Sequence, residues 1–204
     1  MRGTALSEFN DPYTDPSTGV LRNHLGLSSQ AALDAAEADL TWARATQLPT
    51  RRIEATNDLA ELRAIHRHLF QDVYDWAGKV RTVDIRKNVP GAEFFVPVAM
   101  IERSAGFAAE ALQEDGFLRG MSREHLVRRL AFHYDQFNYL HPFREGNGRT
   151  QRLFWSRVVR AAGYDLDWRR VEGETNDAAC QAAGESRDLD PLIELFDLIT
   201  SHEP

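Results

Sequence analysis

The stretch His141-Pro-Phe-Arg-Glu-Gly-Asn-Gly-Arg-Thr-Gln-Arg152 is mostly polar and lies between two segments with helical spacing of apolar residues, 130–140 and 153–163. It is therefore expected to be a loop that joins two packed helices. Pro142 disfavours helical geometry at the residue before it, so the first helix is expected to end at His141. This twelve-residue loop carries most of the functional information in the chain.

The charge of the loop is unusual for the start of a helix. Gly146 and Gly148 permit backbone angles that other residues resist, and the second helix is expected to begin near Gly148 or Arg149. A helix start carries partial positive charge and unpaired N–H groups, which favours acidic residues there. Here Arg149 and Arg152 occupy the first turns, and Arg144 precedes them. The pattern indicates an anion cradle in which both helical arginines reach one polyanion.

Three further side chains of the loop have expected roles. His141 lies at its mouth, and an imidazole with a near-neutral pKa suits removal of a proton from an attacking hydroxyl. Glu145 is a single carboxylate beside the expected phosphate site, an arrangement that Mg²⁺ often uses. Pairing of Glu145 with a nearby arginine is the alternative. Phe143, between polar neighbours, is expected to be a buried anchor for the loop.

On HPFREGNGRTQR (141–152) the chain resembles Fic-domain enzymes, because every defined position of HPFx(D/E)GNGRxxR is matched. Segments 62–87, 11–27 and 188–199 are similar to the family's helix with its Trp-Ala-Gly-x-x-Arg segment, its N-terminal arm and its last helix. The resemblance implies transfer of AMP from ATP, with Mg²⁺, to a Ser, Thr or Tyr hydroxyl of a target protein. Transfer of another nucleotide by the same loop is an alternative.

The resemblance also implies roles for individual residues. His141 would be the catalytic base, and Glu145 would hold the metal. Arg149 and Arg152 would neutralise the β- and γ-phosphates of the leaving pyrophosphate. The nucleotide-binding groups together are expected to be Arg144, Gly146, Asn147, Gly148, Arg149 and Arg152.

One β-like stretch, 81–98, is expected to form a hairpin. In the family this hairpin is a flap that aligns an extended target segment by strand addition. Lys87, Asn88 and Glu93 near its tip are candidate target contacts. The alternative is that the hairpin only covers the core.

The remaining periodicity is helical, which predicts a mainly α-helical Fic fold with about six to eight helices and one β-hairpin flap. Residues 1–28, rich in turn-forming types, are expected to be an irregular N-terminal arm, and 29–204 a single Fic-type catalytic domain. The helices are expected at 29–46, 59–76, 99–113, 122–140, 149–162, 177–183 and 191–201.

Composition limits the class of protein. A content of 43% hydrophobic residues and a net charge of −7 fit a globular protein whose partners are proteins or nucleotides, not nucleic acid. No apolar run reaches the length that a membrane span needs, and the first residues show no signal-peptide core. The single cysteine, Cys180, fits a reducing compartment such as the cytoplasm, and the resemblance to the Fic family implies that the cell is bacterial.

An absence in the sequence bears on regulation. Many Fic proteins carry an inhibitory helix with Ser/Thr-x-x-x-Glu-Gly/Asn, and this sequence contains no full match. The chain therefore resembles the toxins of the family, which a separate small antitoxin with that motif inhibits. The alternatives are a catalytic module of a longer effector secreted into a host cell, and a non-catalytic protein-binding module.

Overall fold

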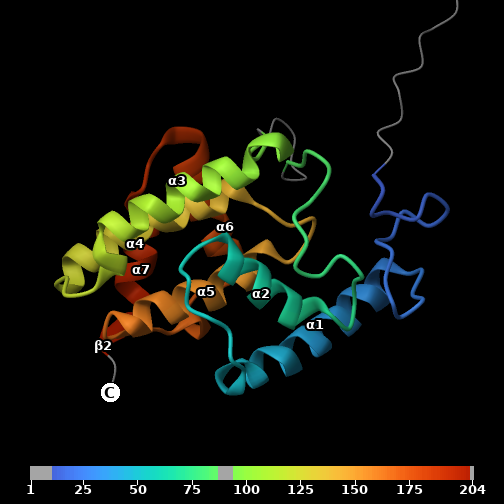
Figure 1. Ribbon diagram of the computed structural model, residues 1–204, viewed down its shortest axis with the longest axis horizontal. Coiled ribbons are helices and arrows are strands. Elements are labelled where there is room, and N and C mark those ends of the chain that lie inside the picture. Colours follow the sequence, from blue (N-terminus) through green and yellow to red (C-terminus); the bar gives the residue numbers. More distant parts are fainter. Residues whose placement is uncertain (1–10, 87–93, 203–204) are drawn as a thin grey trace, which may run out of the picture.

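The computed structural model describes residues 11–86 and 94–202. This part of the chain contains seven α-helices and one small antiparallel sheet (Figure 1). The fold is therefore mainly α-helical, as predicted. The helices are α1 (Gln30–Gln47), α2 (Leu59–Phe70), α3 (Ile101–Glu114), α4 (Arg123–Leu140), α5 (Asn147–Ala161), α6 (Gly173–Ser186) and α7 (Asp190–Ile199), and the strands are β1 (Tyr164–Leu166) and β2 (Thr200–His202).

Helix α4 is central, because it contacts α3, α5, α6 and α7. Its buried side chains join those of α5 in one apolar cluster, in which Phe137 stacks on Phe154 with ring centroids 5.2 Å apart. Helix α2 packs on α5, and α1 packs on α2 at the edge of the molecule (Figure 1). The loop between α4 and α5 is thus anchored at both ends in the core.

Helix α2 is shorter than the sequence pattern predicted. Asp58 caps its start by accepting hydrogen bonds from the N–H groups of Ala60 and Glu61, as expected for an N-cap carboxylate. The helix ends at Phe70 and not at Trp76, and turns follow it. Trp76 is nevertheless buried. The apolar residues beyond Phe70 are therefore buried in a turn, and periodicity alone does not distinguish a buried turn from a helix.

The sheet was missed by the sequence analysis. The predicted last helix extended to Ser201, but α7 ends at Ile199 and the next residues pair with β1, with Leu166 opposite Thr200. Each strand has only three residues, too few for a recognisable alternation. Two other helices also differ in their limits: α5 begins at Asn147 instead of 149, and α6 spans 173–186 instead of 177–183.

The arms of the expected hairpin lie antiparallel. They share an isolated bridge between Arg86 and Phe94, and the Phe95 N–H donates to the Ile85 carbonyl at 3.1 Å. The described residues of the two arms do not form regular β-strands. The tip, 87–93, lies outside the described residues.

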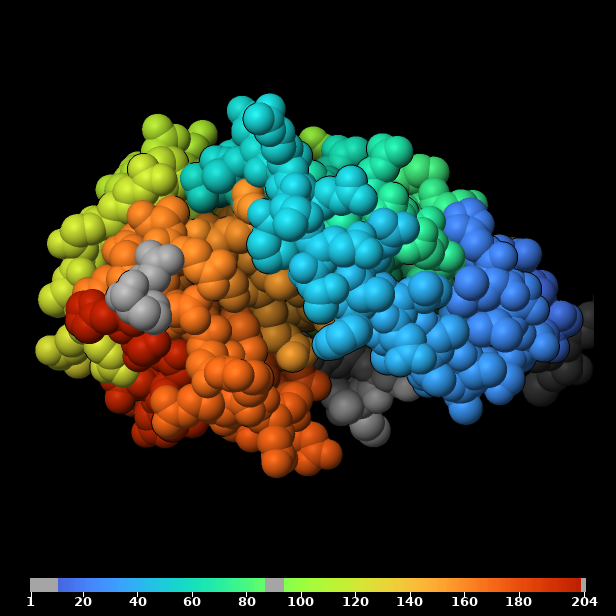
Figure 2. All heavy atoms as spheres, turned by 90° about the horizontal axis from the view of Figure 1, so that it is seen from below, coloured from blue at the N-terminus to red at the C-terminus, as the bar shows by residue number. Residues whose placement is uncertain are grey.

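The described part of the N-terminal arm, 11–28, and the segment after α1 both lie against the helical body. Tyr13 packs edge-on against Trp76 with ring centroids 5.5 Å apart. On the face in Figure 2, segment 48–58 (cyan) lies beside the surface of α5 (orange), and Arg157 of α5 donates to the Ile53 carbonyl at 2.9 Å. None of the helices in the described ranges is long and apolar enough to cross a membrane.

Candidate active site

His141 closes α4 in a left-handed conformation, with φ 40° and ψ 59°. Its Nδ1 lies 3.2 Å from the Asn138 carbonyl, and its ring stacks on Phe95 with centroids 3.8 Å apart. A carbonyl oxygen only accepts, so Nδ1 carries the proton in this contact. The backbone contact and the ring stacking therefore fix the orientation of the imidazole.

Arg81 holds the backbone of this histidine. Its Nε donates to the His141 carbonyl at 2.9 Å, its Nη1 donates to Val83 O at 2.8 Å, and its Nη2 donates to Val96 O. The guanidinium is buried, and burial lowers the pKa of Arg81. Arg81 thus links the loop of His141 to both arms of the hairpin. It lies in the Trp-Ala-Gly-x-x-Arg segment, which was noted only as a resemblance.

Helix α5 begins at the expected anion cradle. Gly146 is its N-cap with φ 80°, and the first intrahelical bond of this turn runs from Thr150 N–H to Gly146 O at 3.1 Å. The N–H groups of the residues between them lie in the first turn, where α-helices have no intrahelical acceptors. Asn147 uses its side chain to brace the loop, with Oδ1 accepting from Phe143 N at 2.9 Å and Nδ2 donating to Phe143 O at 2.7 Å.

The arginines of the loop differ in their partners. Arg149 is ion-paired with Glu37 of α1 and lies over the Phe70 ring, 4.8 Å from its centroid. Arg144 is ion-paired with Asp11 of the N-terminal arm at 2.7 Å. By contrast, the Nε of Arg152 is buried and has no hydrogen-bond partner among the described residues. A buried donor without a partner costs free energy, so Arg152 is the arginine that fits an anionic ligand best.

Glu145 is half-exposed, with 46% of its side chain accessible. Its Oε1 accepts from the Gly146 N–H at 2.8 Å and lies 3.5 Å from Nη2 of Arg149. The anticipated pairing with an arginine therefore exists, but it is long and leaves Oε2 without a contact in the described residues. No group of three or more His, Cys, Asp or Glu side chains that could hold a metal occurs in residues 11–86 and 94–202.

His66 was missed by the sequence analysis, although it supports the loop. The Gly78 N–H donates to its Nδ1 at 2.8 Å, so Nε2 carries the proton and donates to the Glu145 carbonyl at 3.0 Å. Its ring stacks on Phe143 with centroids 3.9 Å apart. Burial, with a smaller effect of Arg149, lowers the pKa of His66 to about 4. The pattern of α2 marked this face only as core.

Phe143 is buried, as expected of the loop anchor. Lys87, Asn88 and Glu93, the candidate target contacts, lie outside the described residues.

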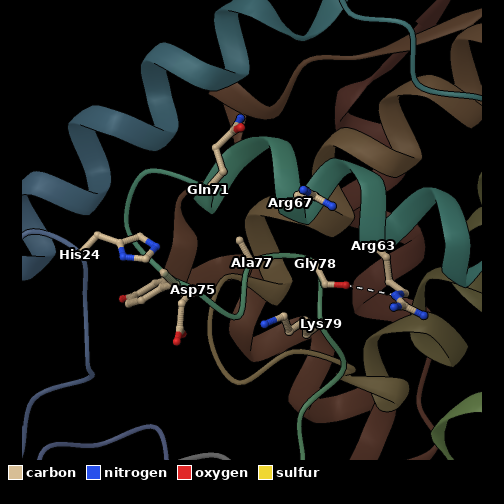
Figure 3. Close-up of a pocket in the computed structure, with 9 residues that line it drawn as sticks. His24, Arg63, Arg67, Gln71, Asp75, Ala77, Gly78 and Lys79 are labelled. Atoms are coloured by element: carbon tan, nitrogen blue, oxygen red, sulfur yellow. Dashed lines mark hydrogen bonds between the residues drawn. The ribbon is translucent and has the colours of Figure 1, made fainter.

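A separate pocket of about 510 Å³ lies beside α2 (Figure 3). Its charged lining residues are exposed, and Figure 3 shows Arg63 bonded to the Gly78 carbonyl, at 3.1 Å, on one wall with Lys79 nearby. Tyr74 also lines the pocket and donates through its hydroxyl to Glu37. This pocket contains none of the residues of the 141–152 loop, so it is not the expected nucleotide site.

Two curated relatives match most of this chain. One is "Protein adenylyltransferase VbhT" of Bartonella schoenbuchensis, 43% identical over 163 residues, which are 80% of this chain and 34% of the relative. The other is "Probable protein adenylyltransferase Fic" of Escherichia coli (strain K12), 37% identical over 196 residues, 96% of this chain and 95% of the relative. The chain thus spans about a third of the first relative and nearly all of the second.

Solved structures agree. The N-terminal Fic domain of a putative cell filamentation protein from Bartonella quintana, a VirB-translocated Bep effector protein with bound ADP, superposes with a TM-score of 0.87 at 27% identity. It covers 94% of this chain and 95% of that one. The model of the Fic/DOC family matches residues 56–158, which include His141 and Arg152. The signature loop, the helical fold and these matches show that the chain belongs to the Fic/DOC family.

Proposed function

We propose that this chain is a protein adenylyltransferase that moves AMP from ATP to a Ser, Thr or Tyr hydroxyl of a target protein. The observation that carries the proposal is Arg152: its Nε is buried without a hydrogen-bond partner among residues 11–86 and 94–202, and it lies on the helix whose first-turn N–H groups follow Gly146. Such a site fits a polyphosphate. The curated relatives are named protein adenylyltransferases, and the Bartonella quintana domain is described with bound ADP.

In the proposed reaction His141 accepts the proton of the target hydroxyl at Nε2. The hydroxyl oxygen then forms a bond to the α-phosphorus of ATP. The bond from that phosphorus to the oxygen bridging to the β-phosphorus breaks, and pyrophosphate leaves. Arg149 and Arg152 offset the charge on the leaving group. The Nδ1 bond to Asn138 O keeps the imidazole in the required tautomer throughout binding.

Glu145 would hold Mg²⁺, through its exposed carboxylate. The described residues supply a single carboxylate here, which fits Mg²⁺ only if phosphate oxygens and waters complete its coordination. When bound, the metal would neutralise phosphate charge. Arg144 is expected to act at the edge of the site, held by Asp11.

The decisive test is incubation of the purified chain with labelled ATP, GTP, CTP and UTP in a cell lysate. We expect label from ATP on a protein, and its loss in His141→Ala by about 10²–10⁴-fold, the usual contribution of a general base. The matched control is His125→Ala, an exposed histidine in the first turn of the same helix. Transfer at the wild-type rate by His141→Ala would refute the role of base, and label only from another nucleotide would change the donor. Nucleotide binding without transfer to any protein would favour a non-catalytic binding module.

We further propose that the chain acts in the bacterial cytoplasm as a toxin with a separate antitoxin, with 29–204 as the catalytic domain and 1–28 as its arm. The support is the sequence, which lacks the inhibitory motif Ser/Thr-x-x-x-Glu-Gly/Asn. Expression of the wild type should stop bacterial growth, and expression of His141→Ala should not. Equal growth of both strains, with soluble wild type, would favour a target in another kind of cell, as for a secreted effector module.

The hairpin is proposed to dock the target by strand addition, with Lys87, Asn88 and Glu93 at its tip. The antiparallel bridge between Arg86 and Phe94 supports this arrangement. Charge reversal at Lys87 and Glu93 should lower transfer to the protein target and leave ATP affinity unchanged. A fall in ATP affinity instead would place these residues at the nucleotide.

A further inference from the structure

Helix α1 buries an unusual stripe. The side chains of α1 that are buried against the protein are Leu33, Glu37 and Thr41, spaced four residues apart on one face. Glu37 is only 6% exposed. A carboxylate in such a place costs free energy unless it is paired and hydrogen-bonded. The stripe therefore calls for partners on the facing elements.

Both partners of Glu37 belong to the surroundings of the signature loop. Arg149 donates to Glu37 Oε1 through Nη2, and Tyr74 donates to Oε2 through its hydroxyl. Nη1 of Arg149 also donates a longer hydrogen bond, of 3.4 Å, to Oγ1 of Thr41. Burial, and then the bond to Glu37, raises the pKa of Tyr74 well above its usual range, so its hydroxyl stays protonated and donates.

The guanidinium of Arg149 is also held from its face. The Phe70 ring lies 4.8 Å away, within cation–π range. Arg149 is therefore fixed by its edge to α1 and by its plane to the end of α2. An arginine has five N–H donors, and the bonds to Glu37 and Thr41 leave donors for a phosphate.

We propose that Glu37 is a positioning residue, which with Tyr74 aims the Arg149 guanidinium at the phosphates of the nucleotide. This inference rests on the proposed function, because it assigns Arg149 to phosphate binding. Glu37 acts through Arg149 and does not itself touch the substrate. Preorganisation of this kind reduces the ordering that nucleotide binding requires.

The alternative to positioning is competition, in which Glu37 occupies Arg149 N–H donors that the phosphate would otherwise use. The two effects predict opposite changes. If Glu37 positions Arg149, its removal weakens ATP binding; if it competes, its removal strengthens binding. Glu37→Ala, Glu37→Gln and Tyr74→Phe are therefore compared with the wild type in ATP affinity by calorimetry, and in KM for ATP and kcat.

We expect Glu37→Ala to weaken ATP affinity about tenfold to a hundredfold, by analogy with the loss of a residue that orients a metal ligand. Glu37→Gln keeps an oxygen that accepts from Arg149, so it should recover part of the affinity. Tyr74→Phe keeps the ring and removes one donor, so its effect should be smaller. Unchanged or tighter ATP binding by Glu37→Ala would overturn the proposal.

A second pair of a buried glutamate and an arginine, whose arginine also lies on α5, provides the matched control. Glu61 of α2 is 1% exposed, and its Oε1 accepts from Nε of Arg157 on α5 at 2.5 Å. Arg157 lies eight residues beyond Arg149 and outside the signature loop. Glu61→Ala should therefore cost a similar shift in melting temperature and leave ATP affinity unchanged. An equal loss of affinity in both variants would show a general structural effect.

A double mutant separates this inference from the proposed function. If Glu37 acts through Arg149, Glu37→Ala should have no further effect on ATP affinity in an Arg149→Ala background. An additive further loss would overturn the positioning role. If the wild type itself neither binds ATP nor transfers AMP, the proposed function fails, whatever the variants do.

Discussion

Arg81 donates a hydrogen bond to the backbone carbonyl of His141 at 2.9 Å, from a guanidinium with no exposed side-chain surface. His141, the proposed catalytic base, is thereby fixed by a residue 60 positions earlier in the chain. The same guanidinium also donates to Val83 and Val96, so the base and the hairpin arms share one anchor. Loss of this anchor should affect catalysis and stability together.

Arg81→Lys should reduce kcat and lower the free energy of unfolding by about 2–4 kcal/mol, because one ammonium cannot reproduce a planar fork to three carbonyls. The control is Arg103→Lys, an exposed position on α3. Urea unfolding and transfer assays on both variants check this. If Arg81→Lys has the same unfolding free energy and transfer rate as the control, the hydrogen bonds of Arg81 do not contribute to stability or catalysis.

Substitution by alanine should cost much more stability at Gly146 than at Gly148. A Cβ at Gly146 would lie 2.2 Å from Cζ of Phe70, and φ is +80°, so Gly146→Ala should cost about 3 kcal/mol or more. A Cβ at Gly148 meets only Nη2 of Arg152, at 3.9 Å, so Gly148→Ala should change stability by less than about 1 kcal/mol. Thermal unfolding of the two variants is the measurement. Equal losses would mean that Phe70 yields to the new methyl group.

His66 should make folding stability depend on pH. Its folded pKa of about 4 lies below the ordinary value of 6.5, so the unfolded state binds more protons and stability rises with pH. The contribution of His66 is fully present above pH ~6.5 and is lost as pH falls towards 4, up to about 3 kcal/mol.

The check is urea unfolding of the wild type and His66→Gln at pH 7 and pH 5. The wild type should lose more stability than the variant between these values. His133, whose pKa burial also lowers, remains in both proteins and cancels in the comparison. An identical pH dependence of the two proteins would show that the pKa of His66 does not change on unfolding.

Arg152→Ala should weaken ATP affinity about tenfold to a hundredfold, the range that corresponds to one lost charge-assisted contact. The buried Nε of Arg152 has no hydrogen-bond partner among the described residues, and an anion would supply one. Arg160→Ala, at an exposed position eight residues further along α5, is the control and should bind ATP normally. Calorimetry with and without Mg²⁺ gives both results. Unchanged affinity of Arg152→Ala would remove the second arginine from the phosphate site.

The sequence by itself determined the helical class, the loop between α4 and α5 and the identity of its chemical groups. These depend on local physics: apolar periodicity, the effect of Pro142 on His141, and the concentration of charge within twelve residues. The short sheet and the end of α2 were not determined in this way, because three-residue strands and buried turns leave no period of their own.

Only the tertiary structure decided which of the loop arginines are ion-paired to distant carboxylates and which one has a buried donor without a partner in the described residues. Arg144, Arg149 and Arg152 look equivalent in the sequence, but Asp11 and Glu37 pair with the first two, whereas the Nε of the third has no hydrogen-bond partner in the part of the chain that the structure describes. Asp11 lies 133 residues before Arg144 in the chain, and Glu37 lies 112 residues before Arg149. Pairing over such separations depends on how helices pack, and no local pattern of residues specifies it.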